Sequence, residues 1–102
     1  MVLAHVRGEV DLSNVTSVRA ELLEAVPKTA VALVLDLSAA DHVDSSGIRL
    51  IFELAERLES RGQKLRVVVP DDSLVGRVLT LTEVHRVVPI SSSLEAVLRD
   101  EV

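Results

Sequence analysis

The sequence predicts an α/β domain with a mostly parallel four-stranded sheet and about four helices. Two observations carry this prediction. Val31–Leu35 is an unbroken apolar run, and a strand without polar/apolar alternation is typical of a parallel sheet covered on both faces. Downstream, apolar residues recur at 3.6-residue spacing from Ile48 to Leu58, which indicates an amphipathic helix. A strand followed by such a helix favours right-handed crossovers onto a parallel sheet.

The N-terminal half fits this alternation. Met1–Arg7 is expected to form a first strand, which the turn Gly8–Asp11 ends. A helix over Val15–Val26 follows, with Ser13 or Asn14 as its N-cap.

The central strand is expected to close at Asp36, and a helix is expected over Gly47–Arg61. Gly62 then stands where a left-handed C-terminal cap is common.

The C-terminal half repeats the pattern twice. Leu65–Val69 is expected to be a second buried strand, followed by a helix over Leu74–Leu81 that Asp71, Asp72 or Ser73 caps. Val87–Ile90 is expected to be a short edge strand, because it contains a proline. Ser91–Ser93 then caps a last helix, whose inward-facing residues are expected to be Leu94, Val97 and Leu98.

Composition narrows the classes of function. The 102 residues form one domain over 1–102, and a content of 48% hydrophobic residues excludes a disordered chain. No apolar stretch approaches the roughly 18 residues of a membrane span, so we expect no direct membrane insertion and a cytoplasmic location. The chain has no cysteine and its three histidines lack ligand-like spacing, so neither a metal nor a cofactor is expected. A net charge of −5 without clustered basic residues argues against nucleic acid.

The junction between the central strand and its helix reads Asp44-Ser45-Ser46-Gly47. Asp and Ser before a helix are most often caps, which accept hydrogen bonds from the free N–H groups of the first turn. Such a cap stands at an exposed helix start, so it is compatible with modification of a serine hydroxyl. The motif alone is weak evidence for a modified serine. The surrounding sequence decides between a simple helix cap and a site of modification.

That context resembles the STAS domain, the family of the bacterial anti-sigma-factor antagonists. The shared pattern is an apolar strand, Asp-Leu-Ser at Asp36–Ser38, then Asp44–Gly47, then the helix. The turn Gly8-Glu9-Val10-Asp11 matches the family's upstream turn, and the run from Leu79 to Ala96 resembles its closing helix, strand and helix. The resemblance covers nearly the whole chain.

The resemblance implies a regulatory protein and not an enzyme, with no catalytic residues. Its partners would be an anti-sigma factor that is also a serine kinase, and a phosphatase that resets the protein. The unphosphorylated form would bind the anti-sigma factor, and phosphorylation at Ser46 would release it, so that transcription is regulated by partner switching. The remaining site residues near the phosphate would be Asp11, Asp44, Ser45 and Gly47. Gly47, which lacks Cβ, is expected to let the kinase approach the serine closely.

Two departures from the family pattern lead to expectations about structure. The family's first N-terminal strand has no counterpart before Met1, so either the sequence is truncated or the sheet has an exposed edge. Such an edge can pair with another chain, and we expect a monomer or a weak homodimer. Glu83 stands where the family commonly has glycine, and a positive φ there would strain a residue with a Cβ.

Two other functions are alternatives. An accessory STAS subunit of an ABC-type membrane transporter, bound to its ATPase, would share the fold; its gene would lie in a transporter operon. A serine hydrolase is disfavoured because no Gly-x-Ser-x-Gly motif is present and no base is tied to the serines.

Overall fold

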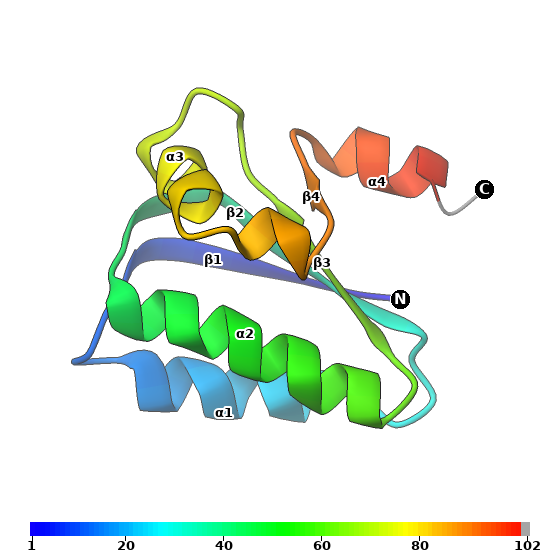
Figure 1. Ribbon diagram of the computed structural model, residues 1–102. Helices are drawn as coiled ribbons and strands as arrows, with labels where there is room; N and C mark the ends of the chain where they lie inside the picture. Colours follow the sequence, from blue (N-terminus) through cyan, green and yellow to red (C-terminus); the bar gives the residue numbers. More distant parts are fainter. Residues whose placement is uncertain (101–102) are drawn as a thin grey trace.

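The four strands form one parallel sheet in the order β1-β2-β3-β4 (Figure 1). The computed structural model describes residues 1–100, with Asp100 described by its backbone alone. The strands are β1 (Val2–Val10), β2 (Ala32–Val43), β3 (Lys64–Val68) and β4 (Ile90–Ser91). β2 is an inner strand, as predicted from its apolar run, although Val31 lies before the strand and is 63% exposed. Within the described residues β1 forms one edge of the sheet.

The helices are divided between the two faces of the sheet. They are α1 (Val15–Ala25), α2 (Ser45–Ser60), α3 (Leu74–Leu81), α4 (Leu94–Asp100) and a short 3₁₀ helix, η1 (Val84–Arg86). The main core joins α1, α2, α3 and η1 to one face of the sheet, where Leu33 and Leu35 of β2 are buried. A small second core on the other face joins Val34 and Val68 to Val97 of α4. Coverage on both faces explains why β2 begins as an uninterrupted apolar run.

The long helices α1 and α2 lie side by side on the first face (Figure 1). An ion pair joins them, with 3.0 Å between Arg19 Nε and Glu53 Oε2. Gly62, the second residue after α2, has a φ of +72°, as its expected role in the C-terminal cap requires. No helix within residues 1–100 is both long and apolar enough to cross a membrane.

Both N-terminal strands are longer than predicted. β2 was expected to close at Asp36 and β1 at Arg7, but the two strands stay paired until Val10 meets Val43. The ladder shifts register between His5 and Arg7 and again between Gly8 and Glu9. The added parts of the two strands carry no apolar pattern because most of their side chains are exposed. They are strands only because their backbones pair with each other.

The segment before β4 also differs from the prediction. Val87–Ile90 was expected to be a strand, but the strand is Ile90–Ser91, and the preceding residues form η1. The N–H groups of Val87 and Val88 donate to the Val84 carbonyl at 3.0 and 2.9 Å. These bonds close a helical turn, and Val84 and Val88 are both buried at helical spacing.

The predicted caps and inward-facing residues of α3 and α4 are confirmed in part. Ser73, one of three candidates, caps α3 by accepting from the Gly76 N–H at 3.0 Å. Ser93 accepts from the Ala96 N–H at 3.2 Å at the start of α4. Val97 is buried, but Leu98 is 49% exposed, so its predicted inward position is wrong. Only one stripe of this short helix faces the sheet.

Glu83 has the left-handed backbone that was expected where the family commonly has glycine, with φ 63° and ψ 23°. For a residue with a Cβ this conformation costs about 1–2 kcal/mol. Glu83→Gly should therefore raise the free energy of unfolding by about 0.5–1 kcal/mol, after allowing for the greater flexibility of unfolded glycine. Thermal unfolding should show a melting temperature a few degrees higher.

The matched control is Glu83→Ala, which keeps the strained backbone. It removes the exposed ion pair of 3.7 Å between Glu83 Oε1 and Arg86 Nε, which should contribute little. If the alanine variant is stabilised as much as the glycine variant, backbone strain is not the cause.

Candidate functional site

The predicted motif lies at the C-terminal edge of the sheet, where β1 and β2 end together. The Asp44 N–H donates to the Val10 carbonyl at 3.1 Å, so the start of α2 sits beside the turn that follows β1. The loops after parallel strands emerge at one edge of the sheet, which is the usual place for binding sites in open α/β sheets. The resemblance implied that Asp11 lies near the motif; Asp11 and Asp44 directly follow the ends of β1 and β2.

Asp44 is the N-cap of α2. Its Oδ1 accepts from the backbone N–H groups of Ser46 at 2.8 Å and Gly47 at 3.1 Å. Its Oδ2 accepts from the Leu12 N–H at 3.3 Å. One carboxylate therefore satisfies two free donors of the helix and also holds the loop between β1 and α1.

Asp44→Ala should lower the free energy of unfolding by about 0.5–2 kcal/mol, because both capping bonds and the bond to Leu12 are lost. Asp44→Asn is the control, since its amide oxygen can still cap the helix. Chemical denaturation of both variants decides the role: equal losses would assign the effect to the charge of Asp44 and not to capping.

The two serines of the motif have different surroundings. Ser45, the first residue of α2, is exposed, whereas Ser46 is half-buried. The Ser46 N–H is held by Asp44. Ser45 is therefore the more exposed of the two residues.

Gly47 lies in the packed interior at the start of α2, where it is buried. A Cβ built on it would lie 2.6 Å from Val43 Cγ1 and 3.0 Å from the Val10 carbonyl oxygen. Glycine is required here because the start of α2 packs directly against the ends of β1 and β2.

Asp11 organises its own turn and makes its hydrogen bonds there. Its Oδ1 accepts from the Ser13 N–H at 2.9 Å and from the Ser13 hydroxyl. The hydrogen bond from the Ser13 hydroxyl, supported by backbone N–H groups, holds the pKa of the Asp11 carboxyl below its ordinary value, against the opposing effect of desolvation. The Asn14 side chain completes the turn: its Oδ1 accepts from the Asp11 N–H at 3.0 Å, and its Nδ2 donates to the Glu9 carbonyl at 2.7 Å. Asn14 is thus the N-cap of α1 by position, but its side chain does not cap that helix.

Leu12 is the residue of this region that sequence reasoning missed. It is 78% exposed while its N–H is bonded to Asp44. The available signal was one leucine within the polar run Asp11–Asn14. An exposed apolar side chain at this edge of the sheet is a contact that a protein partner can use.

The described residues contain no group of three or more His, Asp or Glu side chains that could hold a metal ion. This edge offers the exposed residue Ser45 at the N-terminus of α2, directly after the carboxylate of Asp44. A phosphate placed there would meet the positive end of the helix dipole, although Asp44 already accepts from the N–H groups of Ser46 and Gly47.

Comparisons with known proteins agree on the type of domain. The STAS domain family model matches residues 1–97. A protein of Bordetella bronchiseptica, BtrV, which is named as a candidate anti-sigma factor antagonist, is 29% identical over 96 residues, covering 94% of this chain and 82% of that protein. A crystal structure of an anti-sigma factor antagonist from Mycobacterium paratuberculosis has the same fold: its TM-score is 0.83 at 24% identity, over 96% of this chain and 82% of that one. The antagonist SpoIIAA in its unphosphorylated form gives a TM-score of 0.74 at 19% identity, over 97% and 86% of the two chains.

Proposed function

The chain belongs to the STAS family, and we propose that it is an anti-sigma factor antagonist controlled by phosphorylation of the serine pair Ser45–Ser46. In this proposal the unmodified protein binds a kinase-type anti-sigma factor through the edge of the sheet that carries Asp44, and so frees a sigma factor. Phosphorylation releases the anti-sigma factor, and a phosphatase restores the binding form. The protein acts as a regulator and not as an enzyme.

The observation that carries the proposal is the position of the serines. They begin a helix whose cap, Asp44, is already hydrogen-bonded, so a phosphate can be added to a hydroxyl without removing the cap. The relative BtrV bears the name of the same activity, which supports the proposal but does not identify the partner.

Electrostatics explain why phosphorylation would change the affinity for the partner more than the stability of the fold. A phosphate adds about −1.5 to −2 charges at neutral pH. The N-terminus of α2 favours that charge by about 0.3–1 kcal/mol, whereas the Asp44 carboxylate opposes it. Within the exposed domain these effects partly offset each other, and salt screens them. In a complex the same charge would have to be desolvated beside an acidic side chain, which is strongly unfavourable.

The structure bears on the choice between the two serines. The family resemblance predicts Ser46 as the phosphoacceptor. Exposure favours Ser45, because Ser46 is half-buried and Ser45 is not. A kinase must bring ATP to within bonding distance of the hydroxyl, so we propose Ser45 as the acceptor and treat Ser46 as the alternative that mapping would reveal.

The test is incubation with candidate kinase-type anti-sigma factors and ATP, followed by intact mass measurement and phosphopeptide mapping. We expect a single added phosphate on Ser45, which Ser45→Ala abolishes. Phosphate on Ser46 would overturn the argument from exposure but keep the switch. Phosphate on Ser91–Ser93, or persistence of the mark when both motif serines are replaced by alanine, would overturn the proposed function.

A further inference from the structure

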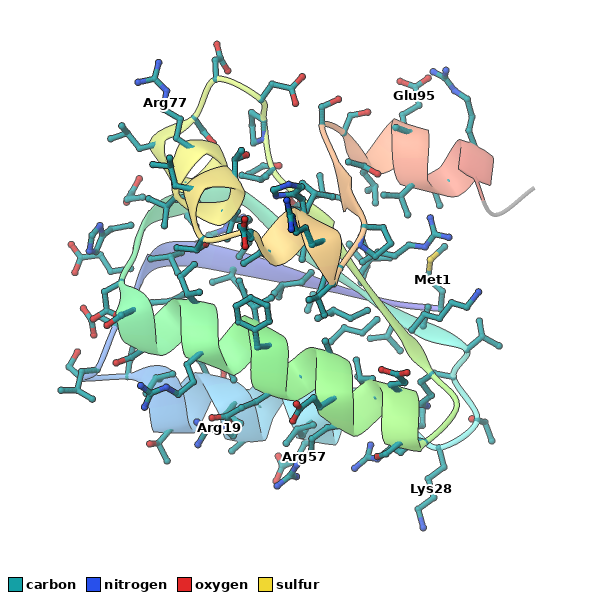
Figure 2. All side chains as sticks on the ribbon, in the orientation of Figure 1. Met1, Arg19, Lys28, Arg57, Arg77 and Glu95 are labelled. Carbon is teal, nitrogen blue, oxygen red and sulfur yellow. The ribbon has the colours of Figure 1, made fainter. Side chains whose placement is uncertain are left out.

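The first half of β1, Val2–Val6, is an open edge of the sheet. The sheet order places β1 at one end, where it pairs only with β2 within the described residues. An edge strand leaves alternate backbone N–H and C=O groups without a strand partner, and these groups can pair with a further strand. The segment begins beside Met1, at the opposite end of the molecule from the start of α2 (Figure 2). It is therefore separate from the serine pair, and the inference does not depend on the proposed function.

The second half of β1 carries features that normally prevent such pairing. Arg7 and Glu9 are charged and exposed. Gly8, between them, has a φ of +74°, and the ladder shifts register beside it. Charged side chains and bulges both discourage the pairing of an edge with another chain.

The opposite edge of the sheet is protected as well. β4 has only two residues and directly follows Pro89. Lys64 and Arg66 place charge on the part of β3 that lies beyond its ladder with β4. A short edge strand, a proline and a lysine are common means of blocking an edge.

The segment Val2–Val6 lacks these features. It contains no proline, glycine, lysine, arginine or carboxylate. Its only titratable side chain, His5, already has a partner within the chain, with 2.8 Å between its Nδ1 and Asp36 Oδ2. Of the edge positions among the described residues, this segment is therefore the one left open to another strand.

Three alternate residues of the segment form an apolar row at the border of the main core: Val2, Ala4 and Val6. All three pack against the core on the face that α1 and α2 cover, yet each stays partly exposed. A further strand beside them would complete their burial.

We propose that this segment pairs with the same segment of a second copy of the chain, as an antiparallel strand pair with its two-fold axis at Ala4. Opposite residues of an antiparallel pair point to the same face of the sheet and contact each other. On the face of the apolar row, Ala4 would meet Ala4, and Val2 of each copy would meet Val6 of the other. On the other face, Leu3 would meet His5, so no like charges stand opposite each other.

This self-complementarity identifies the occupant as a second copy. The apolar row of one chain continues directly into that of the other, and the segment carries no charged group that would select a partner of opposite charge. The two-fold contact uses the open edge of both copies, so assembly stops at a dimer. Five paired residues cover only about 17 Å of strand. The contact is thus smaller than the roughly 1,200–2,000 Å² of a stable interface, and we expect a weak dimer.

The chain has no cysteine, so an engineered cysteine tests this register. In Ala4→Cys the two Cβ atoms of a dimer would stand about 4.5–5.5 Å apart, within reach of a disulfide after a small shift. Val2→Cys and Val6→Cys are matched controls, because each thiol would lie about 14 Å from its own copy along the strands. We expect Ala4→Cys to form covalent dimers at least about tenfold faster than either control, with diamide as oxidant and non-reducing electrophoresis as readout. An equimolar mixture of the two controls should cross-link again.

Sedimentation velocity provides a second measurement. The sedimentation coefficient of the wild type should rise with protein concentration up to about 1 mM, as expected for a weak interface. Ala4→Lys would place two ammonium groups opposite each other at the axis, which is unfavourable, and it should weaken self-association by at least about tenfold. The control is Ala39→Lys, the same change at an exposed residue of β2, which should associate like the wild type. Far-UV circular dichroism verifies that each variant is folded.

Three results would overturn the proposal. They are a sedimentation coefficient of the wild type that stays that of a monomer up to about 1 mM, equal rates of cross-linking at the three cysteine positions, and undiminished self-association of folded Ala4→Lys. The cysteine variants test the pairing even where the lysine variant fails to fold.

Discussion

Gly47→Ala is expected to lower the free energy of unfolding by about 1–3 kcal/mol, the usual range for overpacking a core. The added Cβ would lie 2.6 Å from Val43 Cγ1, and Val43 is itself buried between strand and helix. Alanine favours a helix by up to about 1 kcal/mol over glycine, so the gain in propensity offsets only part of the clash. Urea denaturation should show the loss as a lower transition midpoint at unchanged slope.

A double-mutant cycle with Val43→Ala is the control for this prediction. Removing Val43 Cγ1 takes away the closest contact of the new Cβ, although the Val10 carbonyl oxygen remains at 3.0 Å. Gly47→Ala should therefore cost less in the Val43→Ala background than in the wild type. If the cost is the same in both backgrounds, close packing against Val43 is not the reason for glycine at this position.

Ser45→Asp is expected to weaken binding to the cognate anti-sigma factor by more than about tenfold, or at least about 1.4 kcal/mol. The new carboxylate would stand next to Asp44 and would be desolvated in the complex. High salt should restore only part of the affinity, because screening acts weakly on a buried charge. Titration calorimetry at two salt concentrations measures both effects.

Ser60→Asp is the matched control, since it makes the same chemical change at an exposed residue at the other end of α2. It should leave the affinity within about twofold of the wild type, as expected for a charge outside the interface. Ser45→Ala should also bind well, because it removes the hydroxyl without adding charge. Equal weakening by Ser45→Asp and Ser60→Asp would point to net charge and not to a local interface.

The elements that the sequence predicted well are those with a periodic apolar pattern. α2 was predicted from its apolar stripe, and Gly62 was predicted as its cap. The apolar run of β2 predicted an inner strand because helices cover both faces there. The exposed second half of β2 has no such pattern, and only its pairing with β1 makes it a strand. Local sequence carries no signal for that pairing.

The geometry of the candidate site could be predicted from the sequence only in part. A cap at Asp44 follows from its place before the helix, but the bond from Leu12 to its second oxygen depends on how two distant loops meet. The packing role of Gly47 depends likewise on Val10 and Val43, which are brought together by the sheet. These features depend on tertiary contacts and cannot be read from neighbouring residues.

The central claim is that a phosphate on the serine pair separates this protein from its partner without unfolding it. The most direct measurement is titration calorimetry of the unmodified and the phosphorylated protein against the same anti-sigma factor, with the melting temperature of each form measured in parallel. We expect the phosphorylated form to bind at least about tenfold more weakly, at a melting temperature within a few degrees of that of the unmodified form. Equal affinities of the two forms would contradict the account and leave Ser45 and Ser46 as residues of a helix start alone.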